Sequence, residues 1–162
     1  MRFNHMELTF PLGSLSADFR RDVDSFYCDI LGWSAVDTDV PGVGNCHILL
    51  PDDGQFLLLA EADTHIDSPG WDHLGLLQDD RSEVDRLLEE CQRFADKDER
   101  MRLKEFERDL VTGPVTTHAF YFRFLLPLWF DVQSLEYSSG GPAHRWEYTD
   151  SVTTDADVAA II

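Results

Sequence analysis

The first pattern along the chain is an alternation of polar and apolar residues over 2–10, RFNHMELTF. In an extended strand this alternation puts His5 on one face and Met6 on the other. From residue 16 to residue 31 the apolar residues instead recur at helical spacing, and Gly32 then marks a typical helix end. The opening therefore predicts a strand followed by an amphipathic helix that packs on the Met6 side of the strand.

Short apolar runs separated by turn residues follow this helix. The segments WSAVDT, CHILL and QFLLLAEA are typical of strands. PDDG lies between the last two and predicts a hairpin, because Pro presets one backbone angle and Gly accepts an unusual one. The first half of the chain is therefore expected to run strand, helix, strand, strand, strand.

The second half begins in the same order. DHLGLLQ is a strand pattern, and DDRSEVDRLLEECQRFA has the apolar spacing of a helix, with Asp80 and Glu83 as a capping pair. VTTHAFYFRFL and LWFDVQSLEY predict a hairpin around Pro127. The charged segment at about 96–112 is expected to be an inserted helical piece, and 141–162 to be a polar tail.

The chain thus repeats one order of elements, first over 1–66 and again over 67–140. The repeat places His5 and His73 in matching first strands. A lone histidine in a strand is usually a satisfied structural residue, whereas two at equivalent positions are candidates for one site. The pattern predicts an α+β protein built from two related modules.

Composition narrows the possible functions. The chain has 162 residues, of which 43% are apolar, enough to build a substantial core. The net charge of −18, from 31 acidic and 13 basic residues, argues against a nucleic-acid partner, because phosphates would be repelled. The acidity is otherwise typical of a solvated surface or of a site for a cationic ligand. The sequence shows neither a membrane-length apolar run nor a signal-peptide pattern, so a cytoplasmic protein is expected.

Several stretches resemble proteins of the vicinal oxygen chelate superfamily, which includes glyoxalase I, type I extradiol ring-cleaving dioxygenases, and bleomycin- and fosfomycin-resistance proteins. HMELTF and FYCDILGWS resemble their opening, HLGLLQ the first strand of their second module, and FYFRFLLPLWFDVQSLEYSSGG their closing hairpin. The resemblance covers residues 3–140. It implies two βαβββ modules whose curled mixed sheets form a cleft, with the helices outside and a metal in the cleft.

The resemblance also implies a metal site on His5, His73 and a carboxylate of the last strand. Glu136 in SLEY is the expected carboxylate. Counting from the turn proline puts Gln133 at that position instead, which would leave the metal without a carboxylate. Two histidines and one carboxylate leave open positions for a bidentate substrate and O₂, as in non-haem iron enzymes. Fe(II) is therefore the expected metal, with Mn, Ni and Zn as alternatives.

The function implied is an extradiol-type ring-cleaving dioxygenase acting on a small catechol-like compound. Such enzymes carry a His and a Tyr near the final hairpin, and the corresponding residues here are His118, as acid–base group, and Tyr121, as hydrogen-bond donor. One alternative is a glyoxalase-like lyase or isomerase with Glu61 or water as a further ligand. The other is a non-catalytic small-molecule binding protein like the bleomycin-resistance proteins. A homodimer is expected, without membrane contact.

Overall fold

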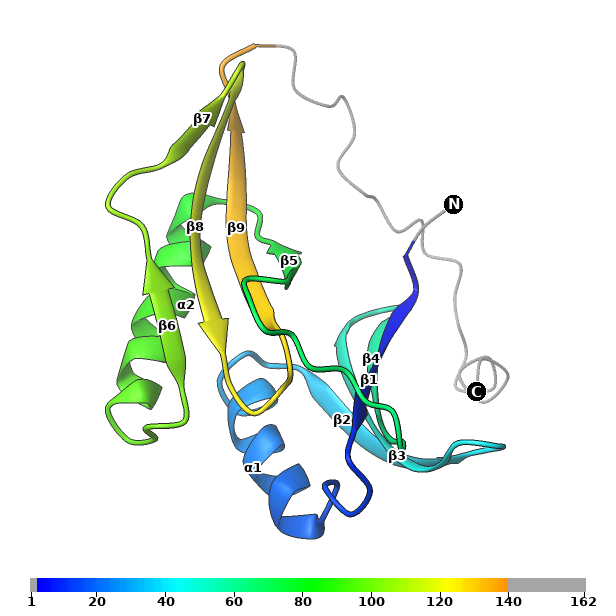
Figure 1. Ribbon diagram of the computed structural model, residues 1–162. Coiled ribbons are helices and arrows are strands. Elements are labelled where there is room, and N and C mark those ends of the chain that lie inside the picture. Colours follow the sequence, from blue (N-terminus) through cyan, green and yellow to red (C-terminus); the bar gives the residue numbers. More distant parts are fainter. Residues whose placement is uncertain (1–2, 140–162) are drawn as a thin grey trace.

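The computed structural model describes residues 3–139, so the expected tail over 141–162 lies outside the described residues. The described strands form two separate sheets (Figure 1). The first sheet has the order β1-β4-β3-β2, with β1 and β4 parallel and the other pairs antiparallel. Its elements are β1 (His5–Phe10), α1 (Ala17–Tyr27), β2 (Ser34–Val40), β3 (Gly44–Asp52) and β4 (Gln55–Glu61).

The second sheet is built from the C-terminal half of the described chain. Its order is β5-β9-β8-β6, with β5 and β9 parallel and β7 paired to β8. Its elements are β5 (His73–Leu77), α2 (Arg81–Ala95), β6 (Arg102–Glu105), β7 (Leu110–Thr112), β8 (Val115–Arg123) and β9 (Trp129–Tyr137). The element order confirms the α+β prediction, because each half runs strand, helix and then antiparallel strands, with its first strand parallel to its last.

The segment at about 96–112 is not the helical piece that its charged pattern suggested. It contains the strands β6 and β7, which pair with β8. The core-facing residues around β6 are Met101 and Leu103, two positions apart, which is the period of a strand. Pairing with the free edge of β8 therefore outweighs the local preference of the charged residues for a helix.

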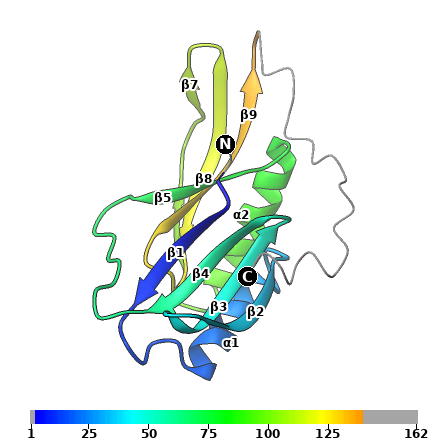
Figure 2. The same cartoon turned by 90° about the vertical axis from the view of Figure 1, so that its right-hand side faces the viewer.

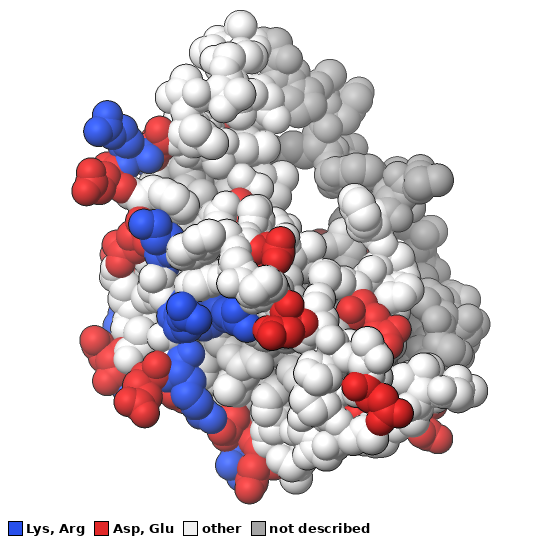
Figure 3. Space-filling view, in the orientation of Figure 1, with Lys and Arg blue, Asp and Glu red and all other residues white. Residues whose placement is uncertain are grey.

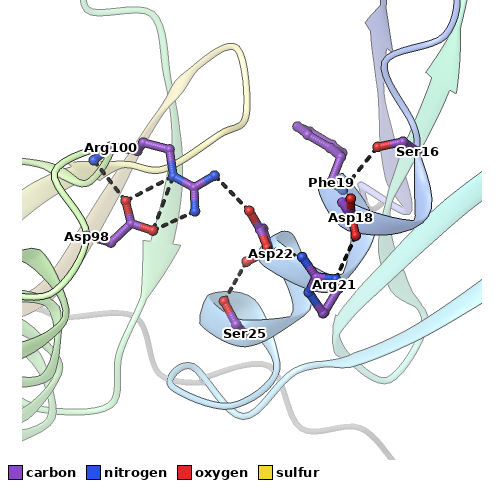
Figure 4. Close-up of polar contacts among 8 residues, drawn as sticks. All are labelled: Ser16, Asp18, Phe19, Arg21, Asp22, Ser25, Asp98 and Arg100. Carbon is purple, nitrogen blue, oxygen red and sulfur yellow. Dashed lines mark hydrogen bonds and ion pairs between the residues drawn. The ribbon is translucent and has the colours of Figure 1, made fainter.

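Both helices begin at a side-chain cap. The Ser16 hydroxyl accepts a hydrogen bond from the backbone N–H of Phe19 at 3.2 Å (Figure 4). The Asp80 carboxylate accepts one from the backbone N–H of Glu83 at 3.1 Å, which confirms the predicted start of the second helix. Each cap satisfies one of the N–H groups that the first turn of a helix leaves without a partner.

The two halves share one hydrophobic core. Phe26 of α1 is fully buried, and its ring lies 5.2 Å from that of Phe122 in β8 and 5.0 Å from that of Phe94 in α2. Tyr27 beside it donates a hydrogen bond from its hydroxyl to the Phe124 carbonyl at 2.9 Å. The first helix therefore packs against its own sheet and the second one. None of the described helices is both long and apolar enough to cross a membrane.

An ion pair also joins the halves at the surface. Arg100, in the turn between α2 and β6, contacts Asp22 of α1 at 2.7 Å and Asp98 at 2.7 Å (Figure 4). Asp98 holds the Arg100 guanidinium in place, and the guanidinium contacts Asp22 of the first half. Because the side chains are partly exposed, water screens this contact and it adds little to the attachment of the halves.

Each sheet thus has a helix face, which packs into the shared core, and an opposite side that we call its outer face. Figure 1 shows α2 behind the second sheet, whose outer face is turned to the viewer. Figure 2 shows the first sheet from its outer face, with both helices behind it. Leu8 is fully buried on the helix face of β1, whereas His5 is exposed on the outer face, as the alternation in this strand predicted.

Candidate functional site

The outer face of the second sheet gathers three groups that can exchange protons or bind a ligand. In the strand register, His73 of β5 lies beside Trp129 of β9, and Tyr121 of β8 lies beside Asp131 of β9. Trp129 and Asp131 are two residues apart in one strand, so they share a face. His73, Tyr121 and Asp131 therefore all lie on the outer face.

The ring of His73 is oriented by a backbone contact. Its Nδ1 lies 2.7 Å from the carbonyl oxygen of Trp71, which can only accept a hydrogen bond, so Nδ1 carries the proton. The other nitrogen, Nε2, then has a lone pair available, and it lies 3.9 Å from Oδ2 of Asp131. Metal-binding and proton-accepting histidines are commonly oriented in this way, by a hydrogen bond from one ring nitrogen to a carbonyl oxygen.

Asp131 is the most unusual polar residue of this face. It is 7% exposed, and its Oδ1 is buried without a hydrogen-bond partner among the described residues. Burial raises the pKa of the Asp131 carboxyl, and His73 and the Tyr121 hydroxyl oppose this effect. Burial and the nearby Asp131 also raise the pKa of Tyr121. A buried carboxylate oxygen without a hydrogen bond lowers the stability of the fold. Groups that carry such a cost are typically retained for function.

Aromatic side chains surround these polar groups. The Trp71 ring lies 4.7 Å from Trp129 and 6.3 Å from Tyr121, measured between ring centroids. The Tyr121 ring also lies 4.9 Å from that of His73 and 5.4 Å from that of Phe106. Trp71 and Phe106 are about half exposed. The face therefore offers a flat ligand stacking surfaces beside an acid–base group.

The structure does not bring the expected metal ligands together. His5 lies on the outer face of the first sheet, where its ring stacks on Phe56 with centroids 4.6 Å apart. Glu136 lies on the helix face of the second sheet, because it is an odd number of residues from Asp131 in the same strand. There its carboxylate contacts Arg81 of α2 at 3.4 Å. Glu136 therefore cannot reach His73, which lies on the other face.

Gln133 lies on the face that Glu136 was expected to occupy. Its Nε2 lies 3.3 Å from the position that a Cβ on Gly75 would take, in the strand next to it. Glu61, the additional ligand considered for a glyoxalase-like site, is engaged elsewhere: its carboxylate accepts a hydrogen bond from the backbone N–H of Leu15 at 2.6 Å. A hydrogen bond from the backbone of Gly13, and then this one from Leu15, lower the pKa of Glu61.

His118 also lies on the helix face, so it does not meet Tyr121 at the outer face. Its Nδ1 lies 2.8 Å from Asp109, and its Nε2 lies 2.8 Å from Asp85 of α2. Arg81, four residues before Asp85, pairs with the same Asp109. His118 is thus held by charged neighbours that attach α2 to the sheet.

The first half contains a corresponding set of contacts around His47. His47 Nδ1 lies 2.8 Å from Asp37, and Nε2 lies 2.8 Å from Asp24 of α1. Arg20, four residues before Asp24, pairs with Asp37 at 2.7 Å. In each half the histidine is on the strand before the last, β3 or β8, and the Arg and the Asp that follows it by four residues are on the helix. The repetition identifies His118 as half of a duplicated structural network, which explains why it does not lie with Tyr121.

The donors present supply part of a metal site. Among residues 3–139, no group of three or more His, Cys, Asp or Glu side chains is placed to hold a metal ion. The pair His73 and Asp131 is compatible with one ion, since two ligands with bonds of about 2.1 Å can be at most about 4.2 Å apart. Oδ2 of Asp131 and the free Nε2 of His73, which lie 3.9 Å apart, are suitable donors. The described chain thus offers two ligands from its second sheet and lacks a third beside them.

Asp131 was not among the residues that the sequence pattern singled out. A signal was available, because Asp131 is the one acidic residue within the apolar run LWFDV. A carboxylate flanked by such residues is a candidate for burial, and buried carboxylates are rare unless they are paired or functional. Trp71 carried no comparable signal, since it precedes the strand and its packing depends on the turn.

Comparison with known proteins identifies the fold. No protein-family model matches this chain, and neither does any curated protein. Among solved structures, a protein assigned to the glyoxalase family from Bacillus anthracis is 11% identical, with a TM-score of 0.57 over 84% of this chain and 96% of the other. The fosfomycin resistance protein FosX from Listeria monocytogenes, complexed with Mn(II) and sulfate, is 12% identical, with a TM-score of 0.54 over 82% and 91%.

A virulence protein from Salmonella typhimurium is similar to the same degree, at 15% identity and a TM-score of 0.54 over 83% of this chain and 96% of the other. Glyoxalase family and FosX proteins belong to the vicinal oxygen chelate superfamily. The chain therefore has the fold of this superfamily, which confirms the fold that the sequence resemblance implied. At these identities the likeness concerns the fold alone.

Proposed function

We propose that the protein is a metal-dependent enzyme acting on a small molecule at the outer face of the second sheet. The observation that carries this proposal is the buried carboxylate of Asp131, whose Oδ1 has no hydrogen bond within residues 3–139, beside the free Nε2 of His73. The Mn(II) recorded in the FosX structure supports a divalent ion, which would polarise adjacent oxygens of a bound substrate. Tyr121 would donate a hydrogen bond to the substrate oxygen as it gains negative charge.

We further propose that the third ligand is His5 of a second copy of the chain. His5 and His73 occupy matching positions on the outer faces of their own sheets, and each outer face lies opposite the shared core. A symmetric dimer that stacks the first sheet of one copy on the second sheet of the other would form two identical sites. This proposal accounts for two ligands in one sheet and the third in the other.

Mixing two defective variants tests this arrangement. Mn(II) binding is measured by calorimetry for the wild-type protein, His5→Ala, His73→Ala and the control His65→Ala, which changes an exposed histidine outside the sheets. The first two variants are expected to lose binding, and the control to keep it. After the two defective variants are refolded together, about a quarter of the wild-type sites should return, because half of the dimers are mixed and each has one intact site.

Three results would contradict the proposal. Full Mn(II) binding by His73→Ala would remove this residue from the site. If both variants lose binding and mixing restores nothing, the two histidines act within one chain. If no divalent ion binds the wild-type protein, the remaining interpretation is a small-molecule binding protein without turnover.

A ring-cleaving dioxygenase using Fe(II) is a second candidate function. The aromatic surfaces of Trp71, Trp129 and Phe106 favour it, because a catechol ring can stack on them. His118 does not support it, since this residue lies on the helix face. Oxygen uptake by protein loaded anaerobically with Fe(II), measured over a panel of catechols, separates ring cleavage from lyase or isomerase chemistry, which consumes no oxygen.

A further inference from the structure

Two basic residues lie on the same outer face as the candidate site. Lys104 of β6 is directly opposite Tyr121 in the strand register, and Arg102 is opposite Arg123. Residues opposite each other in an antiparallel pair share a face. Lys104, Tyr121 and Asp131 therefore form one row across the sheet, and Arg102 and Arg123 lie two residues along the strands from this row.

These cations contact aromatic rings in place of carboxylates. The Arg102 guanidinium lies 5.2 Å from the centre of the Trp129 ring, and the Lys104 ammonium lies 5.7 Å from the centre of the Phe106 ring. Both side chains are exposed, and neither forms an ion pair within residues 3–139. A cation over an aromatic face keeps its charge available on the side turned away from the ring.

The lack of an ion pair is informative because acidic residues outnumber basic ones by 31 to 13. Most other arginines of the described chain form an ion pair with a carboxylate: Arg20, Arg21, Arg81, Arg86, Arg93 and Arg100. The acidic group of this row, Asp131, is buried, and Glu105 next to Lys104 contacts Gln92 of α2 instead. The charge of this face is therefore opposite in sign to the net charge of the protein.

The space-filling view agrees with this charge distribution. Figure 3, drawn in the orientation of Figure 1, shows basic side chains gathered over β6 and the adjoining part of the second sheet, with acidic side chains around them. The carbonyls of Leu126 and Ser68 fix Arg123 at the end of the same face, at 3.3 Å each. The basic residues and the stacked rings form one continuous surface, which we call the basic aromatic patch: Trp71, Arg102, Lys104, Phe106, Tyr121 and Trp129.

We infer that the basic aromatic patch binds a planar anion, such as an aromatic or conjugated carboxylate, and that Arg102 and Lys104 select for its negative charge. The inference rests on the function proposed above, because it names the substrate class of the same site. The rings take the flat part of the ligand, and the two cations take its carboxylate at the β6 edge. The net charge of −18 would by itself suggest a cationic ligand, and the patch reverses this expectation locally.

Three ligands of equal shape and different charge test the inference: 2-naphthoate, 2-naphthalenemethanol and 2-naphthylmethylamine. Calorimetry on the full chain should show naphthoate binding about tenfold more tightly than the neutral alcohol, with the amine weakest. Arg102→Gln and Lys104→Gln should each lower naphthoate affinity about fivefold and leave alcohol affinity unchanged. Lys97→Gln, which removes the same charge from an exposed position after α2, should change neither.

Trp71→Ala separates stacking from charge, because it should weaken naphthoate and alcohol equally. The inference is overturned if the alcohol or amine binds as tightly as naphthoate, if naphthoate does not bind, or if Lys97→Gln acts as strongly as Lys104→Gln. Mn(II) binding is measured on the same samples. Its absence together with an intact preference for naphthoate would reject the proposed metal site alone, whereas intact Mn(II) binding without the preference would reject this inference alone.

Discussion

The two halves of the chain build the same framework and place different residues on it. In the register of β1 and β4, His5 is paired with Phe56 and Glu7 with Leu58. In the register of β5 and β9, His73 is paired with Trp129 and Gly75 with Asp131. Histidine and aromatic residue thus recur at matching positions. The next position on the outer face holds Leu58 in the first sheet and Asp131 in the second.

This difference supports the proposed location of the site on the second sheet. The outer face of the first sheet carries an apolar cluster of Cys46, Ile48, Leu58 and Ala60. The outer face of the second sheet carries the buried carboxylate, the histidine with a free nitrogen and the basic aromatic patch. The helix faces of the two sheets, by contrast, are alike, because both carry a histidine held between two Asp side chains. The two halves are therefore alike on the faces that hold the fold and differ on their outer faces, one of which is the proposed site.

The largest expected effect comes from breaking the core that joins the two halves. Phe26→Ala removes the ring that contacts both α2 and β8, and should lower the free energy of unfolding by about 3–5 kcal/mol. Because the core is shared, urea denaturation followed by fluorescence and by circular dichroism should give one coincident transition. Two separate transitions in the wild-type protein would show that the halves are independent.

The duplicated networks allow a direct comparison of burial. The side chain of His47 is 4% exposed and that of His118 is 20% exposed. His47→Ala should therefore cost about 2–3 kcal/mol, because it removes a nearly fully buried side chain together with its two contacts, and His118→Ala about 1 kcal/mol. The two variants are compared by urea denaturation, with His65→Ala as a control. Equal losses would mean that burial does not distinguish the two networks.

Asp131→Asn tests whether the wild-type carboxylate lowers the free energy of unfolding at a position that is kept for function. At pH 7 the substitution should raise the free energy of unfolding by about 1 kcal/mol in the absence of metal, because it removes the charge of a buried carboxylate whose Oδ1 has no hydrogen bond within residues 3–139. The folded-state pKa of Asp131 is raised, so the ionised form destabilises the fold above this pKa. The gain should shrink as the pH falls and the wild-type carboxyl becomes neutral. A loss of stability at pH 7 would contradict the prediction.

The smallest effect is expected from the carboxylates of the two networks at acid pH. Arg81 and then His118 lower the pKa of Asp109, and His47 and then Arg20 lower that of Asp37. Their ionised forms stabilise the fold above the ordinary Asp pKa of about 3.9, and this contribution is lost as the pH falls through the lowered values. Asp109→Asn and Asp37→Asn should therefore flatten the decline of stability between about pH 5 and pH 2.

The sequence predicted much of the fold because the signals for it are local. The alternation around His5, the helical spacing that follows it and the PDDG turn are each readable within a few residues, and all of them appear in the structure. The match between His5 and His73 follows from the order of elements alone. The segment at about 96–112 was assigned incorrectly because its strand pairing depends on the distant edge of β8.

The candidate site was only partly predictable, for a reason of geometry. By itself the sequence determined the repeated order of elements, the facing of His5 and the aromatic closing hairpin. Only the tertiary structure decided which residues of β9 lie beside His73, because strand faces alternate and one residue of register exchanges them. That parity places Asp131 and Gln133 on the outer face and Glu136 on the helix face. Apart from β6 and β7, the elements of the second half were readable from local patterns, whereas the identity of its carboxylate depended on how β5, β8 and β9 align.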